Sequence, residues 1–286
     1  MIQKVSEINN NTAQIGGKAR NLSVLIRNSI VVPTAYVIGA NLFKDFFIDF
    51  NPKLKHELEG LDELLFNGNV EQFSKKIIKI RNEIMRANFS EKLATEIGHI
   101  FKILYNENSM IACRSSAMSE DGVTHSFAGI FDSFLNVTSR QDLINCIKKV
   151  YASQFSDHAV VYYLKNNIIL QGNEMAVILQ TQVDCQVSGV CFTINPVSKE
   201  EEFFVEYVEG TADSYISGRE TPSFFRCSKN LVMIENTEDI VFNDLLKREL
   251  CLMAIKIKNI FGRDQDIEWC LKDGKFFFVQ SRDITC

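Results

Sequence analysis

The chain has 286 residues, of which 46% are hydrophobic and 23% charged, a composition typical of a globular protein with a large core and not of a disordered chain. It carries 31 basic and 36 acidic side chains without a dense run of Lys and Arg, so neither nucleic acid nor an anionic membrane is expected as a partner. No stretch of eighteen apolar residues occurs, and the N-terminus lacks the apolar core of a secretory signal, so we expect a cytoplasmic protein.

The eight cysteines include no Cys-x-x-Cys pair, and most lie inside apolar runs, as do Cys113, Cys191, Cys251 and Cys270. This placement predicts small buried hydrophobic side chains in a reducing compartment. A reactive thiol or a zinc site is the alternative.

The first part of the chain is predicted to be rich in helices. Gly16 and Gly17 open a helix expected over residues 17–29, and the apolar residues 30–38 that follow are typical of a strand. Residues 40–106 then place apolar side chains at three- and four-residue spacing, which indicates helices that bury one face. The residues with this spacing are Phe73, Ile77, Ile80 and Ile84.

Strands are predicted to dominate the rest of the chain. Residues 111–114 and 127–137 have strand patterns, and Ser139 and Ser156 are placed to cap two helices, the second of which ends near Asn166. Further strands are expected at residues 175–180, 187–194 and 203–208, followed by one long helix at 243–261 and a closing pair of strands.

Helices first and mixed strands later indicate an α+β protein with two lobes and a cleft between them. We place the N-terminal lobe at residues 1–180 and the C-terminal lobe at residues 181–286. No linker rich in Ser, Pro or Gly interrupts the chain, which has only 4 prolines and 14 glycines. The lobes are therefore expected to be parts of one unit and not independent modules.

Polar side chains are concentrated in the closing pair of strands, residues 266–269 and 276–282. The Glu268 carboxylate and the Gln280 side-chain carbonyl are hard oxygen ligands suited to Mg²⁺. Arg282 lies two residues beyond Gln280 and so is expected on the same strand face, where its guanidinium could bind a phosphate oxygen. The alternative is solvated surface charge at the strand ends.

Gly16-Gly17-Lys18 lies at the start of the first predicted helix. Glycines let the backbone approach an anion, the helix N-terminus offers free N–H groups, and lysine adds a point charge. The tripeptide alone also fits a simple helix start, and it is not a P-loop.

Arg114-Ser115-Ser116 ends an apolar strand and leads into a loop at residues 120–129 that is rich in hydroxyls and glycine. Hydroxyls and backbone amides of such a loop can bind the oxygens of a polyphosphate, while Arg114 offsets its charge. The alternative is an exposed hairpin connection.

Five motifs in this order resemble the ATP-binding domain of the phosphoenolpyruvate synthase and pyruvate phosphate dikinase family, an ATP-grasp fold. The resemblance covers essentially the whole chain, and the ordered set is specific although each motif alone is weak. The motifs are residues 16–22, residues 114–129 with Arg114-Ser115-Ser116-Ala117 and Ser126-Phe127-Ala128-Gly129, residues 132–137, residues 188–196, and Asp266-Ile267-Glu268-Trp269 with Gln280-Ser281-Arg282.

The resemblance implies cofactors and roles for single residues. It makes ATP and Mg²⁺ the cofactors, with Lys18 and Arg114 holding the ATP phosphates. It makes Glu268 and Gln280 the metal ligands, with Arg282 as a phosphate-binding arginine beside them. Lys18, Arg114 and Arg282 would thus act on the reacting phosphates, where transfer depends on positioning and charge stabilisation.

Four further nucleotide-binding positions follow from the same resemblance. Ser126 and Gly129 belong to the loop that covers the phosphates. Gln180 ends the strand that meets the adenine, and Glu206 matches an acid that contacts the nucleotide. For Gln180 the alternative is a surface residue at a strand end.

The sequence departs from the family in its histidines. Family members pass a pyrophosphoryl group to a histidine on a mobile domain, but no segment with that motif occurs in this chain. His56, His99 and His158 are expected to be structural or exposed. His125 lies on the predicted phosphate loop and could contact a phosphate or accept a group, although a plain loop residue is favoured.

A second departure is residues 209–218, which lack a family glycine and carry Asp213 where the family has a longer acid, so contacts near this loop are expected to differ. The chain stops at Cys286, where the family's linker to the histidine domain would begin. We therefore expect either a fragment of a longer enzyme or a component whose histidine domain acts in trans.

The favoured hypothesis is an ATP-dependent phosphotransferase that performs the nucleotide half of a dikinase reaction, converting ATP to AMP with pyrophosphoryl transfer to a histidine. A small acceptor such as pyruvate, an antibiotic or an amino-acid amide is then phosphorylated, and the sequence does not choose among them. One alternative is an ATP-grasp kinase or ligase that releases ADP. The other is a non-catalytic nucleotide sensor that signals by lobe closure.

Overall fold

The computed structural model describes residues 2–9, 14–43, 51–105, 109–118, 129–169, 174–211, 221–236 and 241–284. Two compact units make up the chain, and the boundary between them falls inside the first helix. Unit 1 comprises residues 1–20 and 34–182, and unit 2 comprises residues 21–33 and 183–286. The combination of helices and antiparallel sheets confirms the expected α+β class.

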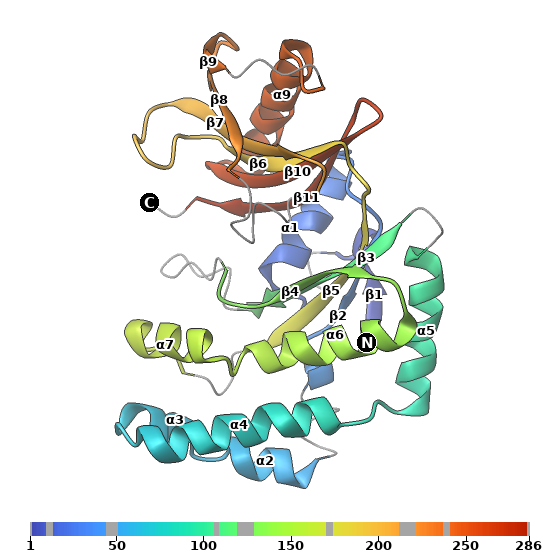
Figure 1. The fold of residues 1–286 in the computed structure, drawn as a ribbon, viewed down its shortest axis with the longest axis vertical. Helices are drawn as coiled ribbons and strands as arrows, with labels where there is room; N and C mark the ends of the chain where they lie inside the picture. The colour runs from blue at the N-terminus through green and yellow to red at the C-terminus, as the bar shows by residue number, and fades with distance from the viewer. Residues whose placement is uncertain are drawn as a thin grey trace. The chain divides into compact units, whose positions relative to one another are not determined.

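Unit 1 is built on a five-stranded antiparallel sheet with the strand order β1-β2-β5-β3-β4 (Figure 1). Its helices form two further layers, with α6 against the sheet and α4 against α6. The strands are β1 (Ile2–Lys4), β2 (Ala35–Ile38), β3 (Met110–Ala117), β4 (Ser133–Val137) and β5 (Met175–Gln182). The helices are η1 (Val5–Glu7), α1 (Gly16–Arg27, which continues into unit 2), α2 (Pro52–Leu58), α3 (Leu61–Phe66), α4 (Val70–Arg86), α5 (Glu91–Leu104), α6 (Arg140–Ser153) and α7 (Asp157–Asn166).

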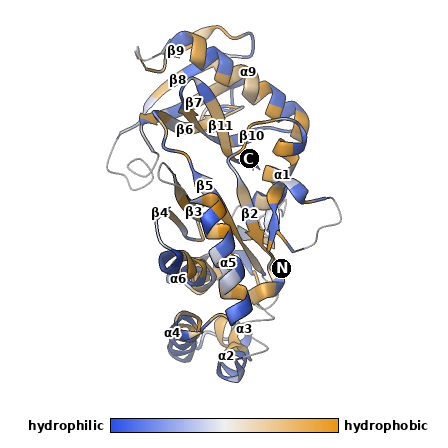
Figure 2. Ribbon diagram, turned by 90° about the vertical axis from the view of Figure 1, so that its right-hand side faces the viewer, coloured by the Kyte–Doolittle hydropathy of each residue, from blue (hydrophilic) through white to orange (hydrophobic). Residues whose placement is uncertain are grey.

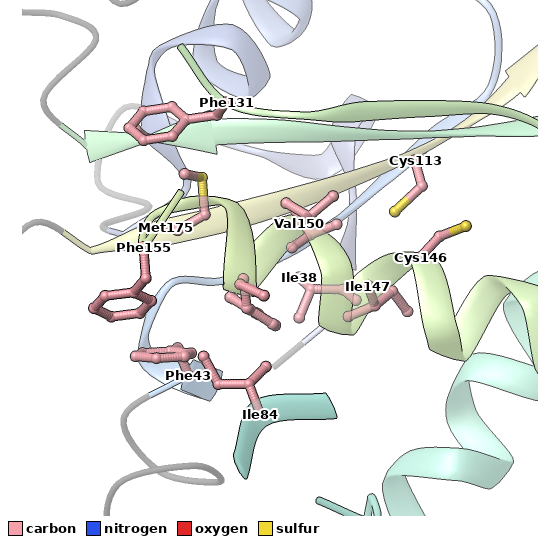
Figure 3. Close-up of a cluster of buried hydrophobic side chains, with 14 of the residues drawn as sticks. Ile38, Phe43, Ile84, Cys113, Phe131, Cys146, Ile147, Val150, Phe155 and Met175 are labelled. Atoms are coloured by element: carbon pink, nitrogen blue, oxygen red, sulfur yellow. The ribbon is translucent and has the colours of Figure 1, made fainter. Parts of the chain in front are cut away.

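The core of unit 1 lies between α6 and the sheet. Figure 3 shows Ile147 and Val150 of α6 close to side chains such as Cys113 of β3 and Ile38 of β2, all fully buried. The four apolar residues of α4 singled out by their spacing are buried as predicted. Figure 2 shows both hydrophilic and hydrophobic residues along α4 and α5, as expected for helices that bury only one face.

The predicted helix caps are confirmed. Ser139 accepts the N–H of Asp142 at the start of α6, and Ser156 accepts the N–H of Ala159 at the start of α7. The second of these helices ends at Asn166, and the cap residue Asn167 adopts the left-handed conformation common at helix C-termini.

Unit 2 is a six-stranded antiparallel sheet with the order β11-β10-β6-β7-β8-β9, and α9 packs against one face of it (Figure 1). Unit 2 has an aromatic core centred on Phe242. The centroid of the Phe242 ring lies 5.0 Å from the ring centroid of Trp269 and 5.0 Å from that of Tyr207. The elements are β6 (Val187–Phe192), β7 (Glu202–Glu209), β8 (Ser223–Ser228), β9 (Met233–Asn236), α9 (Asp244–Phe261), β10 (Gln265–Lys272) and β11 (Lys275–Asp283).

The predicted strand at residues 30–38 is shorter in the structure, where β2 begins only at Ala35. The Ile30 N–H bonds back to the Leu25 carbonyl and closes the end of α1, and Pro33 has no N–H to donate. The residues between them run beside the edge strand β11, where the Phe278 N–H donates to the Val31 carbonyl at 2.9 Å. Similarly, of the predicted strand at residues 127–137 only β4 is formed among the described residues. None of the helices in the described ranges is long and apolar enough to cross a bilayer.

We predict that Gly189→Ala destabilises unit 2. Gly189 lies on β6, and a Cβ atom there would stand 2.1 Å from the Glu206 carbonyl oxygen of β7. Two paired backbones would have to separate, at a cost of about 1–3 kcal/mol in the free energy of unfolding. Urea denaturation measures this free energy.

The matched control is Gly98→Ala in α5. Its new methyl group would meet only the end of the flexible Arg140 side chain, and alanine favours a helix, so little or no loss is expected. Equal destabilisation by both substitutions would contradict the prediction.

Candidate functional site

The N-terminus of α1 is joined to the end of β3, so that two motifs about a hundred residues apart in sequence meet in unit 1. The Ser116 hydroxyl donates to the Ile15 carbonyl at 2.9 Å and accepts the Ala19 N–H at 3.2 Å, which satisfies one of the free donors of the first helical turn. Ser116 is fully buried. It therefore fixes the helix start that carries Lys18.

Gly16 is required at this junction for steric reasons. Its φ is +70°, and a Cβ atom would lie 2.1 Å from the Ser116 carbonyl oxygen. The sequence suggested that the glycines let an anion approach the backbone. The structure shows that Gly16 also lets the helix start approach β3.

Lys18 and Arg114 are brought into the same neighbourhood by this junction. The Lys18 ammonium donates to the Ser115 hydroxyl at 3.3 Å, and Ser115 directly follows Arg114 on β3. Arg114 pairs with Ile178 of β5, two residues before Gln180. Because strand residues alternate between faces, Arg114 and Gln180 lie on one face of the unit 1 sheet.

Gln180 is a buried polar side chain in the interior of the sheet, not a surface residue. It is 1% exposed, and its two cross-strand neighbours are the small residues Ala35 and Ala112. Among the residues that the structure describes, its Nε2 atom has no hydrogen-bond partner. A buried amide donor of this kind is costly unless something else accepts its hydrogen bond.

The predicted phosphate loop is only partly described. Ser126 and His125 lie outside the described residues, as does Asp213 of the later loop. Gly129 is described, and it is exposed with a φ of +68°, a conformation that favours glycine. His56 of α2, His99 of α5 and His158 of α7, which were expected to be structural or exposed, are all exposed.

In unit 2, three predicted site residues lie in one row across the sheet. Gln280 of β11 pairs with Glu268 of β10, Glu268 pairs with Val190 of β6, and Val190 pairs with Glu206 of β7. Directly opposed residues project from the same face. The structure therefore brings the two predicted metal ligands side by side and places Glu206 two strands away.

The next row contains Arg282 and an aspartate whose role was not predicted. Arg282 pairs with Asp266, and its Nε donates to the Asp266 Oδ2 at 2.7 Å, with a second bond from the same guanidinium. Asp266 was part of a recognised motif but was not assigned to the site. The signal was its place two residues before Glu268, on the same face of the strand.

A β-bulge sets this arrangement. The register between β10 and β11 shifts between Glu268 and Trp269, so that Glu268 faces Gln280 while Trp269 faces Phe278. Phe276 and Phe278 of β11 thereby project toward the core, whereas Gln280 and Arg282 project from the opposite face. The predicted common face of Gln280 and Arg282 is therefore seen in the structure.

Asp266, in the row with Arg282, is a largely buried carboxyl group. Its burial raises its pKa above the usual value, while the charge and hydrogen bonds of Arg282 act in the opposite direction and Glu268 adds to the rise. An ionised Asp266 thus depends on Arg282, and the pair holds the guanidinium next to the Glu268 and Gln280 row.

The donor set fits Mg²⁺ when part of the coordination comes from a ligand. Glu268 and Gln280 offer oxygen atoms from adjacent strands, the ligand type that Mg²⁺ prefers. In the described ranges, no group of three or more His, Cys, Asp and Glu side chains forms a metal site by itself. Mg²⁺ bound by one or two protein oxygens usually completes its shell with phosphate oxygens and water.

Comparison with known families identifies the kind of domain that this chain forms. Residues 12–241 match the model described as the pyruvate phosphate dikinase AMP/ATP-binding domain. The chain belongs to this family. The matched range includes Lys18 and Arg114, the two residues predicted to hold the phosphates. Glu268 and Gln280 lie after the end of the matched range.

Relatives of this chain include a probable phosphoenolpyruvate synthase and a rifampicin phosphotransferase. The AMP/ATP-binding domain is 28% identical over 302 residues to a probable phosphoenolpyruvate synthase of Methanothermobacter thermautotrophicus, an alignment that covers 94% of this chain and 44% of the relative. It is 29% identical over 313 residues to a rifampicin phosphotransferase of Streptomyces sviceus, covering 99% of this chain and 35% of the relative. The chain thus spans less than half the length of these relatives.

Among solved structures, C-terminally truncated Cdc123 from Schizosaccharomyces pombe aligns with 96% of this chain and 86% of its own, at 9% identity and a TM-score of 0.42. A likeness this weak carries no argument.

We predict that Arg282→Met destabilises the protein in a pH-dependent way. The pKa of Asp266 is raised in the folded protein, so protonated Asp266 contributes to the stability of the fold at low pH. This contribution is lost as the pH rises through the folded-state pKa of Asp266. Removing Arg282 removes the opposing influence and raises that pKa further. The variant should lose about 1–3 kcal/mol of unfolding free energy near pH 8 and much less near pH 4.

Denaturant titrations at several pH values measure this difference. Arg263→Met is the matched control, since Arg263 pairs with Asp283 at 3.0 Å on the exposed end of the same hairpin and surface pairs contribute little. A loss for Arg282→Met that is equal at both pH values would contradict the assignment to Asp266.

Proposed function

We propose that this chain binds Mg·ATP and performs the nucleotide half of a dikinase reaction. The γ- and β-phosphates pass as a pyrophosphoryl group to a histidine on a separate domain, and AMP is released. The observation that carries this proposal is the pairing of Glu268 with Gln280 in a member of an AMP/ATP-binding family. The hydrogen bond that joins Lys18 to the residue after Arg114 supports it.

We further propose an ATP-grasp organisation, with lobes at residues 1–180 and 181–286 that bind one nucleotide in the cleft between them. Lys18 and Arg114 supply positive charge to the phosphates from unit 1. Glu268, Gln280 and Arg282 supply the metal ligands and a further positive charge from unit 2. Such a set provides what phosphoryl and pyrophosphoryl transfer mainly needs, which is positioning and charge stabilisation.

Each group has a distinct part in this proposal. Bound Mg²⁺ would neutralise charge on the phosphate oxygens. Lys18 acts as a compact point charge, whereas the planar guanidinium of Arg282 can hold two oxygens at once and is kept in place by Asp266. Ser126 and Gly129 complete the proposed contacts from the phosphate loop.

Gln180 is the proposed contact for the adenine base, and Glu206 is the proposed polar contact for the nucleotide from unit 2. The buried Nε2 of Gln180 lacks a partner among the described residues, and a ring nitrogen of adenine is an acceptor suited to it. Ala35 and Ala112 beside it add little side-chain bulk around the amide.

We predict that Gln180→Leu lowers the affinity for ATP without lowering the stability of the unliganded protein. The substitution removes a buried amide that lacks a partner, so the unliganded protein should keep its stability or gain about 1–2 kcal/mol. ATP affinity should fall about tenfold or more, because one hydrogen bond and its polarity are lost. Thermal unfolding and calorimetric titration with ATP measure the two effects.

Gln182→Leu on the same strand is the control, since the Gln182 amide already bonds to Asn136 at the edge of the sheet and ATP affinity should not change. A Gln180→Leu protein that loses stability and binds ATP normally would contradict the proposed base contact.

We propose a small molecule as the final phosphate acceptor. The relatives are named for phosphoenolpyruvate synthesis and rifampicin phosphorylation, so pyruvate and antibiotics are within the proposed range, as is an amino-acid amide. The histidine domain is proposed to follow Cys286 or to act in trans.

The test of this function is the product nucleotide. ATP labelled in the α-phosphate is incubated with the protein, Mg²⁺ and the histidine domain of a relative such as the Methanothermobacter enzyme, and the products are separated by chromatography. AMP is expected, and EDTA should abolish its formation. ADP would instead indicate a kinase or ligase, and binding without turnover would indicate a nucleotide sensor.

We predict that Lys18→Met and Glu268→Gln impair this reaction in different ways. Lys18→Met should weaken ATP binding about tenfold or more through the loss of a charged contact. Glu268→Gln should raise the Mg²⁺ concentration needed for half-maximal AMP formation by a similar factor, because one anionic ligand is lost. Glu249→Gln on the exposed surface of α9 is the control and should leave both quantities unchanged.

A further inference from the structure

Cys185 differs from the other described cysteines in its environment. Six cysteines are buried, as the sequence predicted, whereas Cys185 is only partly buried. It lies between β5 and β6 in unit 2, close to the end of β7. Its thiol is therefore the one among them that solvent reaches most readily.

A second thiol and a hydroxyl surround Cys185. The Cys185 Sγ donates to the Gly210 carbonyl at 3.3 Å, and the Ser188 hydroxyl donates to the same carbonyl at 2.6 Å. Ser188 of β6 pairs directly with Cys270 of β10. Cys185 shares the Gly210 carbonyl with Ser188, and Cys270 lies directly opposite Ser188, so this position brings the two thiols close together.

The contact with Cys270 favours the thiolate of Cys185, whereas the Gly210 carbonyl, which accepts the thiol proton, favours the thiol. The hydrogen bond with Cys270 lowers the pKa of Cys185 below the usual value, although burial and the neighbouring charge of Asp184 oppose it. A lowered pKa increases the thiolate fraction at neutral pH, and the thiolate is the species that reacts with oxidants. A neighbouring thiol can react with the oxidised cysteine to form a disulfide, and a disulfide can be reduced again.

We propose that Cys185 and Cys270 form a peroxide-sensitive thiol pair that closes to a disulfide. The Cys185 thiolate attacks one oxygen of hydrogen peroxide, the O–O bond breaks, and a sulfenic acid and hydroxide result. The Cys270 sulfur then attacks the Cys185 sulfur, the S–O bond breaks, and the released hydroxide takes up the Cys270 proton as water. In total, two thiols are oxidised to one disulfide and one peroxide is reduced to two waters.

The pair lies next to the proposed metal ligands. Cys270 follows Glu268 by two residues on β10 and so projects from the same face of the sheet. A disulfide would tie this part of β10 to the segment before β6 and to its contact with Gly210. If the proposed nucleotide function holds, oxidation should therefore lower the affinity for Mg·ATP, and dithiothreitol should restore it.

The chemical test needs no nucleotide. Reduced protein in a Cys286→Ser background is treated with hydrogen peroxide for increasing times, remaining thiols are alkylated, and peptides are identified by mass spectrometry without reduction. A peptide pair linked through Cys185 and Cys270 is expected. Cys185 should be consumed about tenfold or more faster than Cys146, a buried thiol whose pKa is raised by its burial.

Two variants separate the steps. Cys270→Ser should leave Cys185 as a sulfenic acid that dimedone traps, and Cys185→Ser should remove the fast reaction with peroxide. Consumption of Cys185 no faster than that of Cys146 would overturn the proposal, as would a disulfide that joins Cys185 to another cysteine. The wild-type measurement stands even if a variant does not fold.

Calorimetric titration with Mg·ATP before and after oxidation tests the consequence. Loss of affinity in the wild type but not in Cys185→Ser is expected. A linked pair without any change in affinity would overturn the regulatory consequence alone. Absence of binding in both the reduced and oxidised protein would instead count against the proposed nucleotide function and leave the thiol chemistry intact.

Discussion

The pairing of β10 with β11 is the constraint on which the candidate metal site depends. In the observed register Glu268 faces Gln280 and Asp266 faces Arg282, so one carboxylate, one amide and an ion pair share one face of the sheet. Because side chains alternate along a strand, a slip of one residue in β10 would bring Ile267 to this face in their place. The buried aromatic core on the opposite face prevents such a slip, since Trp269 would have to leave it.

The β-bulge in this hairpin lets the two faces have different compositions. Regular alternation along β11 would place Phe278 and Gln280 on the same face. The extra residue resets the alternation, so that Phe278 lies in the core and Gln280 lies opposite Glu268. The aromatic residues that stabilise unit 2 and the polar residues that we assign to the metal are thus provided by one short strand.

Unit 1 achieves a comparable result through a hydroxyl and a glycine. Ser116 connects β3 to the start of α1 by two hydrogen bonds, and Gly16 allows the close approach of the two backbones. The positively charged side chains Lys18 and Arg114 come from segments far apart in sequence, and this junction brings those segments together. Their spatial relation therefore depends on a polar contact inside the unit and not on the charged residues themselves.

The sequence by itself determined the local features of this protein. Cap residues such as Ser139 and Ser156 have short-range hydrogen bonds, so their helix starts could be predicted from the neighbouring residues alone. The order of the motifs likewise predicted a nucleotide-binding family, which the match over residues 12–241 confirms.

Only the tertiary structure decided which residues meet. The register that opposes Glu268 to Gln280 joins two strands, as does the pairing of Asp266 with Arg282. The placement of Cys185 and Cys270 beside Ser188 joins a loop to two strands. Such contacts depend on how strands align across a sheet, and a bulge of one residue changes the alignment without a clear signal in the sequence. For the same physical reason, the sequence did not show that Gln180 is buried between two alanines.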